Sequence, residues 1–221
     1  MDSVFTMIHE LGHAGNFMLS QKYQSYFDCN PSMFYSESPS TMNEMMLANY
    51  LMKKTEDPRM LRWIYFSIIA KTYYHNFVTH FLEAYFQRKA YNLVDEGQNL
   101  DADTLNRLYK ETLEEFWQGE VELNDGCEMT WMRQPHYYSG LYSYTYSAGL
   151  SIATNVSRKI LEDDEEAVCN WLNAIKQGGL YNAVEWAKLS GVDITTTDSL
   201  KNTISYISSI VDKIEELSKN L

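Results

Sequence analysis

The 221-residue sequence is short of proline, glycine, cysteine and basic residues, and each shortage excludes a class of protein. With four prolines and ten glycines, and no sustained alternation of apolar and polar residues, it does not read as a β-protein. Eighteen Lys and Arg stand against 30 Asp and Glu, a net charge of −12. This balance argues against a nucleic-acid partner, because a phosphate backbone is bound through basic patches.

The cysteines are odd in number and widely spaced: Cys29, Cys127 and Cys169. They form no Cys-x-x-Cys pair, so they predict reduced thiols of a cytoplasmic protein rather than a disulfide framework. The first residues lack the basic stretch of a signal peptide. The apolar run at residues 63–70 is too short to span a bilayer. We therefore expect a cytoplasmic protein without a membrane partner.

The sequence is rich in apolar residues at helical spacing. Hydrophobic residues make up 45% of the chain and aromatic residues 14%, which is enough for a substantial core. No internal repeat or linker interrupts the pattern, so we expect one all-α, multi-helix domain over residues 1–221. The spacing predicts helices at about 3–26, 36–54, 58–93, 101–117, 142–161, 163–178, 180–189 and 198–219.

The first predicted helix contains the segment His9-Glu10-Leu11-Gly12-His13. Histidines four residues apart lie one turn apart on the same helix face, so both rings can reach one ion. This is the H-E-x-x-H arrangement of zinc metallopeptidases, in which the glutamate is the general base. Five residues can match this motif by chance, as in a surface cluster of polar side chains. Other positions must therefore decide whether the segment binds a metal.

A catalytic zinc site also needs a third protein ligand and an open position for water. Glu37 and Glu44 are seven residues apart and share one face of the second predicted helix. A short turn would bring this helix back against the first one. One carboxylate could then bind the metal while the other hydrogen-bonds a histidine ligand. Taken alone, either is better explained as a helix-start carboxylate favoured by the helix dipole, and pairing with the upstream motif reverses that preference.

The two segments together resemble a known family. His9–His13, followed by Glu37-Ser38-Pro39-Ser40-Thr41-Met42-Asn43-Glu44, is similar to the oligoendopeptidase F branch of the thimet oligopeptidase-like zinc metallopeptidases. Gly178-Gly179 and Gly191-Val192-Asp193-Ile194 resemble the C-terminal pattern of the same branch. The resemblance covers nearly the whole chain, and it implies the helical catalytic portion of a zincin-type enzyme.

The resemblance also implies a role for each residue of the two segments. His9, His13 and Glu37 correspond to the ligands of one zinc ion. Glu10 corresponds to the base that activates a zinc-bound water, and Glu44 to the carboxylate behind a ligand. We expect the metal to lower the pKa of that water from about 15.7 to about 7.

Residues 135–146 are rich in histidine and tyrosine and are similar to the substrate loop of the family. The resemblance implies that His136 and one tyrosine, with Tyr144 favoured, donate hydrogen bonds to the peptide carbonyl and to the oxyanion that develops. Without the resemblance, ring packing alone would explain the segment equally well. The alternative substrate-binding tyrosines are Tyr138, Tyr142 and Tyr146. His75 and His80, five residues apart, are interpreted as structural.

Two features depart from the family pattern. The family often has a histidine three residues after the second ligand, where this sequence has Asn16. Since that histidine is not a ligand, we expect metal binding to persist while local contacts or activity differ. The motif also begins after only eight residues, so we expect the chain to lack the N-terminal part that completes the substrate channel.

These residues leave two functional hypotheses open. The first is a zinc-dependent metalloendopeptidase that hydrolyses short oligopeptides. The second is an impaired or inactive fragment that retains the helical core and the metal motif without the complete channel. A helical protein with an incidental histidine pair would not explain the positions of Glu37, Glu44 and His136. We also expect self-association through the apolar face that the absent part would have covered.

Overall fold

The computed structural model describes residues 2–219, and within that range the chain forms helices, turns and loops but no strand. The predicted all-α fold is therefore confirmed. In the same range, no helix combines the length and the apolar character needed to cross a membrane. The α-helices are α1 (Asp2–Tyr23), α2 (Glu37–Lys53), α3 (Pro58–Ser67), α4 (His80–Asp95), α5 (Ala102–Trp117), α6 (Tyr144–Leu161), α7 (Glu165–Ala174), α8 (Ala183–Leu189) and α9 (Asp198–Lys219). Short 3-10 helices are η1 (Met33–Tyr35), η3 (Cys127–Arg133) and η4 (Pro135–Ser139).

Side-chain caps fix the start of several helices. Asp57, Asp101 and Asp164 each accept a hydrogen bond from a backbone N–H in the first turn of the helix that follows. Asn182 and Glu185 form a reciprocal capping box at the start of α8. Each cap satisfies a donor that has no partner inside the helix. These local signals explain why the helices predicted to start at 58, 101 and 163 start within two residues of those positions.

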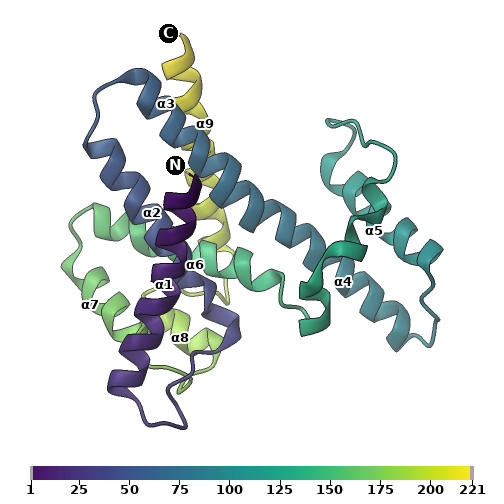
Figure 1. Ribbon diagram of the computed structural model, residues 1–221, viewed down its shortest axis with the longest axis horizontal. Helices are drawn as coiled ribbons and strands as arrows, with labels where there is room; N and C mark the ends of the chain where they lie inside the picture. Colours follow the sequence, from purple (N-terminus) through teal and green to yellow (C-terminus); the bar gives the residue numbers. More distant parts are fainter. Residues whose placement is uncertain (1, 220–221) are drawn as a thin grey trace.

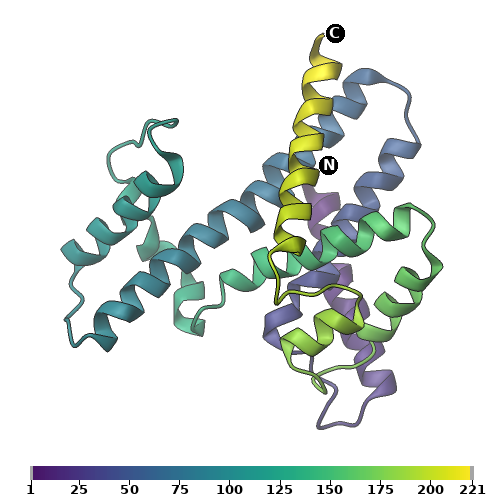
Figure 2. The same cartoon turned by 180° about the vertical axis from the view of Figure 1, so that it is seen from behind.

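The helices form a body and an arm, as Figures 1 and 2 show from opposite sides. The body contains α1, α2 and α6–α9, and α6 contacts α2, α4, α7 and α9. The arm contains α4, α5 and the turn η3. Two apolar clusters fill the body, one around Trp186 and one around Met45, and a third lies between Phe86 and Tyr109 in the arm.

One long helical stretch joins the body to the arm. The sequence predicts a single helix over residues 58–93, but the structure contains α3, a π-helix η2 (Ile68–Thr79) and then α4. The backbone N–H of His80 bonds to the carbonyl of His75, which is the wider π spacing. Thr72 and Asn76 of this segment are buried in the body. Such π segments are uncommon and are frequently found at functional sites.

Helices α1, α2 and α6 meet closely where Gly12 and Gly149 lie. A Cβ atom at Gly12 would lie 2.4 Å from the carbonyl oxygen of Pro39, and one at Gly149 would lie 2.9 Å from the carbonyl carbon of Glu37. Real Cβ atoms do not approach so near, so only glycine permits this contact. The first turn of α2 is therefore held directly against α1 on one side and α6 on the other.

Candidate metal centre

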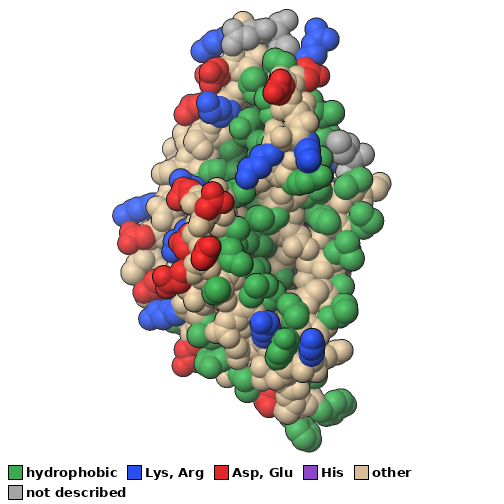
Figure 3. All heavy atoms as spheres, turned by 90° about the vertical axis from the view of Figure 1, so that its left-hand side faces the viewer, with side chains coloured by type: hydrophobic (Ala, Val, Ile, Leu, Met, Phe, Trp, Pro, Cys, Tyr) green, Lys and Arg blue, Asp and Glu red, His purple; other side chains and the backbone are tan. Residues whose placement is uncertain are grey.

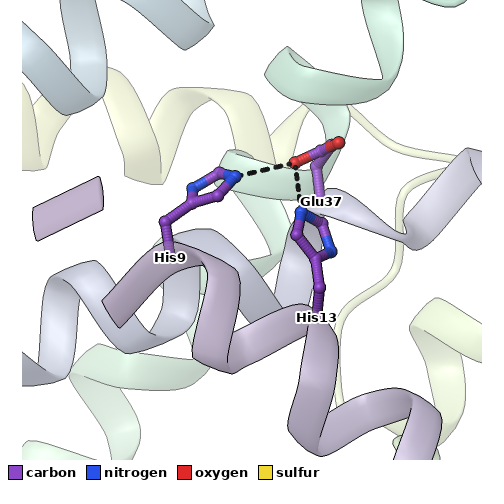
Figure 4. Close-up of side chains that lie close together, drawn as sticks. All are labelled: His9, His13 and Glu37. Atoms are coloured by element: carbon purple, nitrogen blue, oxygen red, sulfur yellow. Dashed lines mark ion pairs between the residues drawn. The ribbon is translucent and has the colours of Figure 1, made fainter. Parts of the chain in front are cut away.

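The histidines of α1 and the first residue of α2 converge on one point (Figure 4). The Nε2 atoms of His9 and His13 each lie 3.4 Å from Glu37 Oε2. Two ligands about 2.0–2.1 Å from a tetrahedral zinc ion are separated by about 3.3 Å, so these separations suit a shared ion. The donor set, two imidazoles and one carboxylate, is that of a catalytic zinc site. The residues present therefore fit the metal that the sequence predicts.

Glu37 is held in place by hydrogen bonds to both of its oxygens. The Tyr142 hydroxyl donates to Oε1 over 2.9 Å, and the Ser40 hydroxyl donates to Oε2 over 3.1 Å. Glu37 is buried. Although burial acts in the opposite direction, hydrogen bonds from His13, His9 and Tyr142 hold the pKa of Glu37 below its ordinary value. The carboxylate is thus ionised, as a metal ligand must be.

Glu44 lies behind His9, on the side away from Glu37. His9 Nδ1–H donates to Glu44 Oε1 over 2.7 Å, and the Thr72 hydroxyl donates to Glu44 Oε2. This bond fixes the ring so that Nε2 faces the centre. Burial alone would lower the pKa of His9, but the hydrogen bonds and charges of Glu37 and Glu44 raise it to about 10. A metal must therefore displace a proton when it binds.

A cleft of about 490 Å³ lies beside His9, and Glu10, His75 and Tyr146 are among the other residues that line it. Glu10 is exposed on α1 and belongs to the wall of this cleft. Burial raises the pKa of Tyr146, and the negative charge of Glu10 adds to this rise. The base that the motif predicts thus shares one open space with a ligand and a tyrosine hydroxyl.

His136, Tyr142 and Tyr146 form one cluster of rings next to Glu37. The centroid of the His136 ring lies 5.1 Å from that of Tyr142 and 5.6 Å from that of Tyr146. The Tyr146 hydroxyl donates to the Tyr142 hydroxyl over 3.4 Å. Because Tyr142 in turn donates to Glu37, the histidine and tyrosine segment is connected to the metal centre through a hydrogen bond.

The structure does not bring Tyr144 and Tyr138 to this cluster. The Tyr144 ring packs against Phe34 with a centroid separation of 5.9 Å, and Tyr138 is 95% exposed. Residues two apart in a helix point to different sides, so Tyr144 faces away when Tyr146 faces the cleft. The arrangement favours Tyr142 and Tyr146 over Tyr144, and the roles given to Tyr144 and Tyr138 stay predictions.

Sequence reasoning missed Thr72 and Glu83. Thr72 supports Glu44 from the π-helix, whose register no apolar pattern reveals. Glu83 accepts a hydrogen bond from His80 Nδ1 over 2.7 Å, and His136 belongs to the same group. The three-residue spacing of His80 and Glu83 on a predicted helix was a visible signal for this pair.

Asn16 is buried and has a structural contact. Its Nδ2 donates to the Ile175 carbonyl over 2.9 Å, and the hydroxyl of Ser20, one turn later, donates to the same oxygen. Asn16 thus ties α1 to the end of α7, apart from the metal ligands. The expectation that metal binding persists with Asn16 at this position stays a prediction.

Comparisons with known proteins show which family the chain matches. A family model described as peptidase family M3 matches residues 1–206. The chain is 26% identical to oligopeptidase PepF of Bacillus subtilis (strain 168), over 98% of this chain and 32% of that protein. It is 28% identical to group B oligopeptidase PepB of Streptococcus agalactiae serotype III (strain NEM316), over 98% of this chain and 36% of that protein.

A solved structure shows the same fold. The crystal structure of oligoendopeptidase F from Enterococcus faecium superposes with a TM-score of 0.84 at 26% identity, and the match covers all of this chain and 40% of that one. The chain therefore spans about a third of the length of the curated relatives it matches. It aligns with only part of each of these proteins.

Proposed function

The chain belongs to peptidase family M3, and from this premise we propose that it is a zinc-dependent metalloendopeptidase that hydrolyses short oligopeptides. The observation that carries the proposal is the convergence of His9, His13 and Glu37 on one point, with Glu10 in the wall of the adjoining cleft. The oligopeptidase names of the relatives support the substrate class. The acidic surface favours cationic ligands, peptides included.

Zinc bound by His9, His13 and Glu37 would supply the Lewis acidity that lowers the pKa of a water to about 7 and polarises a peptide carbonyl. Glu10 then accepts the proton of the attacking water and delivers it to the leaving amine. Its position in the cleft wall, exposed to solvent, supports this role. Glu44 keeps the His9 ring oriented throughout, because its carboxylate bonds to the nitrogen that faces away from the centre.

We propose His136 and Tyr146 as the donors to the developing oxyanion. Tyr146 lines the same cleft as Glu10, and its raised pKa keeps the phenol protonated, as a donor must be. Burial and the positive field of His80 lower the pKa of His136, so its ring is neutral and still carries one N–H. Tyr142 is engaged with Glu37 and serves mainly to position that ligand. Removing one oxyanion donor typically costs about 10² to 10³ in rate.

The decisive experiment is the Glu10→Gln variant, assayed with an internally quenched fluorescent peptide. The wild-type chain with one equivalent of zinc should cleave the peptide, and a chelator should stop the cleavage. Glu10→Gln should retain the zinc and lose turnover, because the amide cannot accept the proton. Full activity of a zinc-loaded Glu10→Gln protein would refute the role of Glu10.

The second candidate function is an impaired chain that binds metal but cleaves poorly. It is favoured by the coverage of only about a third of the relatives, since the rest of a substrate channel could lie in the unmatched part. The same assay separates the two candidates. Stoichiometric zinc without chelator-sensitive cleavage would support the impaired chain.

We also propose a cytoplasmic location and self-association. Three unpaired cysteines support the former. Exposed apolar side chains along α1, among them Met7, Leu11 and Met18, support the latter.

A further inference from the structure

A buried carboxylate in the arm ties down the segment that carries the proposed oxyanion donor. Glu83 lies on α4 and is 6% exposed. His80 Nδ1–H donates to its Oε2 over 2.7 Å, and the Ser143 hydroxyl donates to the same oxygen over 3.1 Å. The side chain of Gln134 donates to Oε1 over 2.7 Å. Both oxygens of this buried group are therefore satisfied by named donors.

Two of the three donors come from opposite ends of one segment. Gln134 precedes η4 and Ser143 precedes α6, so residues 134–143 begin and end on the same carboxylate. A third contact lies between them, where the Gln87 side chain on α4 donates to the Tyr137 carbonyl over 3.2 Å. The segment consists of the short 3-10 helix η4 and a turn that contains two residues with positive φ, Gly140 and Leu141. Its conformation thus depends on contacts with α4.

His80, which lies on α4 one turn before Glu83, also contacts residues next to the cleft. The His80 ring stacks on Tyr146 with a centroid separation of 4.1 Å and an angle of 19°. It also lies 5.4 Å from the ring of His136. His80 is therefore in contact with Glu83 on one side and with both proposed oxyanion donors on the other.

We propose that Glu83, with His80, is a positioning device for the substrate-side segment: it clamps residues 134–143 against α4 and so places His136 beside the metal centre. The inference rests on the proposed function, because it assigns the clamp a purpose in that reaction. Glu83 does not line the 490 Å³ cleft and its carboxylate is taken by three donors, so it acts through the segment that carries His136 and not on the substrate. A bound peptide would therefore meet a His136 ring whose position is fixed by contacts with α4 in the arm.

The cluster of His80, Glu83 and His136 has the donor types of a metal site, but its contacts are those of a clamp. The 2.7 Å separation between His80 and Glu83 is that of a direct hydrogen bond. The remaining capacity of the carboxylate is taken by an amide and a hydroxyl from the segment. Although burial opposes ionisation, the hydrogen bond from His80 lowers the pKa of Glu83, so the acceptor is charged and its bonds are strong.

Hydrogen exchange monitored by mass spectrometry tests the clamp without reference to activity. In Glu83→Gln, exchange of the backbone amides of residues 134–143 should accelerate at least ~10-fold while α1 and α2 are unchanged, because a neutral amide cannot accept three bonds. Gln134→Ala, which leaves α4 intact, should accelerate the same peptides. Glu115→Gln is the matched control, since Glu115 pairs with Lys89 on the same arm but is exposed. Unchanged exchange in both clamp variants would overturn the inference.

Zinc content and a double-mutant cycle complete the test. Glu83→Gln should bind as much zinc as the wild type, and a loss of one equivalent would show a metal site instead of a clamp. With peptide substrate, kcat should fall by about 10² with little change in KM. Glu83→Gln combined with His136→Ala should be no slower than His136→Ala alone, whereas multiplicative losses would contradict an action through His136. If the chain proves inactive, the exchange result still decides the clamp, so the two proposals can fail separately.

Discussion

Among single side chains, the orientation of His9, a proposed metal ligand, depends on a relay of hydrogen bonds that begins at Thr72. Thr72 donates to Glu44, Glu44 accepts from His9, and His9 turns its other nitrogen to Glu37. Once a metal has displaced the Nε2 proton, the relay holds the ring in one tautomer, with Nε2 directed at the metal. Each member is buried or half-buried, so its bonds are little weakened by water.

The relay predicts the effect of Glu44→Gln. The amide keeps the volume of the carboxylate but not its charge, so His9 becomes a weaker and less well oriented ligand. We expect zinc affinity to fall 10- to 100-fold with little change in far-UV circular dichroism. Competition with a chromophoric chelator measures the affinity. Glu56→Gln, an exposed carboxylate in the loop after α2, is the control, and equal affinities for the two variants would contradict the relay.

Between elements, the metal centre depends on how closely α1 and α2 approach. The glycine of the motif, Gly12, lies against the backbone of Pro39 and Ser40. This contact brings the first residue of α2 within reach of both histidines of α1. The glycine is thus required by packing between helices, in addition to the metal chemistry of its neighbours.

Gly12→Ala should therefore be strongly destabilising. Its methyl group has no space, so α2 must move, at a cost of about 1–3 kcal/mol or more in the free energy of unfolding. Zinc affinity should fall with it, since Glu37 moves with α2. Chemical denaturation and zinc titration measure both. Gly15→Ala is the matched control, because a Cβ there meets nothing within 4 Å; it should be neutral or up to about 1 kcal/mol more stable. Equal stability of the two variants would exclude the packing role of Gly12.

The helices themselves were predictable, but one change of register was not. Capping residues and apolar periodicity are local, and they place the ends of α5, α6 and α9 within about two residues. The π-helix is not local in this sense, because its wider hydrogen bonds are stabilised by burial of Thr72 and Asn76 in the body. Apolar spacing alone therefore predicts one uninterrupted helix.

The candidate site was predictable to different degrees. His9 and His13 follow from helical spacing, and the roles of Glu37 and Glu44 came from the family resemblance. The choice of Tyr144 met no support in the contacts. Between His136 and α6 the chain passes through the rest of the 3-10 helix η4 and then through two residues with positive φ. This path determines which tyrosines face the cleft. Such a path depends on tertiary contacts with α4, which the sequence does not display.

For the whole molecule, a bound metal should add stability because its ligands come from two helices. An ion that binds only the folded chain at 100 times its dissociation constant contributes about 2.7 kcal/mol. For a chain of this length, that corresponds to a rise in Tm of about 5–10 °C. Differential scanning fluorimetry with zinc and then excess chelator measures the shift. Glu37→Gln should show little or none, and an equal shift in that variant would place the metal elsewhere.

The outer surface of the molecule predicts self-association. Figure 3 shows hydrophobic side chains gathered on the face that α1, α2 and α7 present at the left of Figure 1. On α1, Met7, Leu11 and Met18 are exposed, Met18 by 71%. Light scattering should therefore give a mass above that of the monomer at high concentration, because apolar patches of this kind associate.

Met18→Lys tests whether α1 is responsible. A charge in the apolar row should shift the protein toward the monomer. Ile204→Lys, at an exposed position of α9 on the opposite side of the body, should not. A wild-type protein that stays monomeric at high concentration would disprove the expectation.

The long helical stretch that links body and arm has a consequence for attempts to isolate the centre. A synthetic hairpin of α1 and α2 would contain His9, His13 and Glu37. It would lack the Thr72 hydroxyl, which donates to Glu44, and the Glu83 carboxylate, which binds both ends of residues 134–143. The proposed ligands are close together in the sequence, but these two supporting residues lie on the stretch from α3 to α4. A minimal version of this centre must therefore include that stretch.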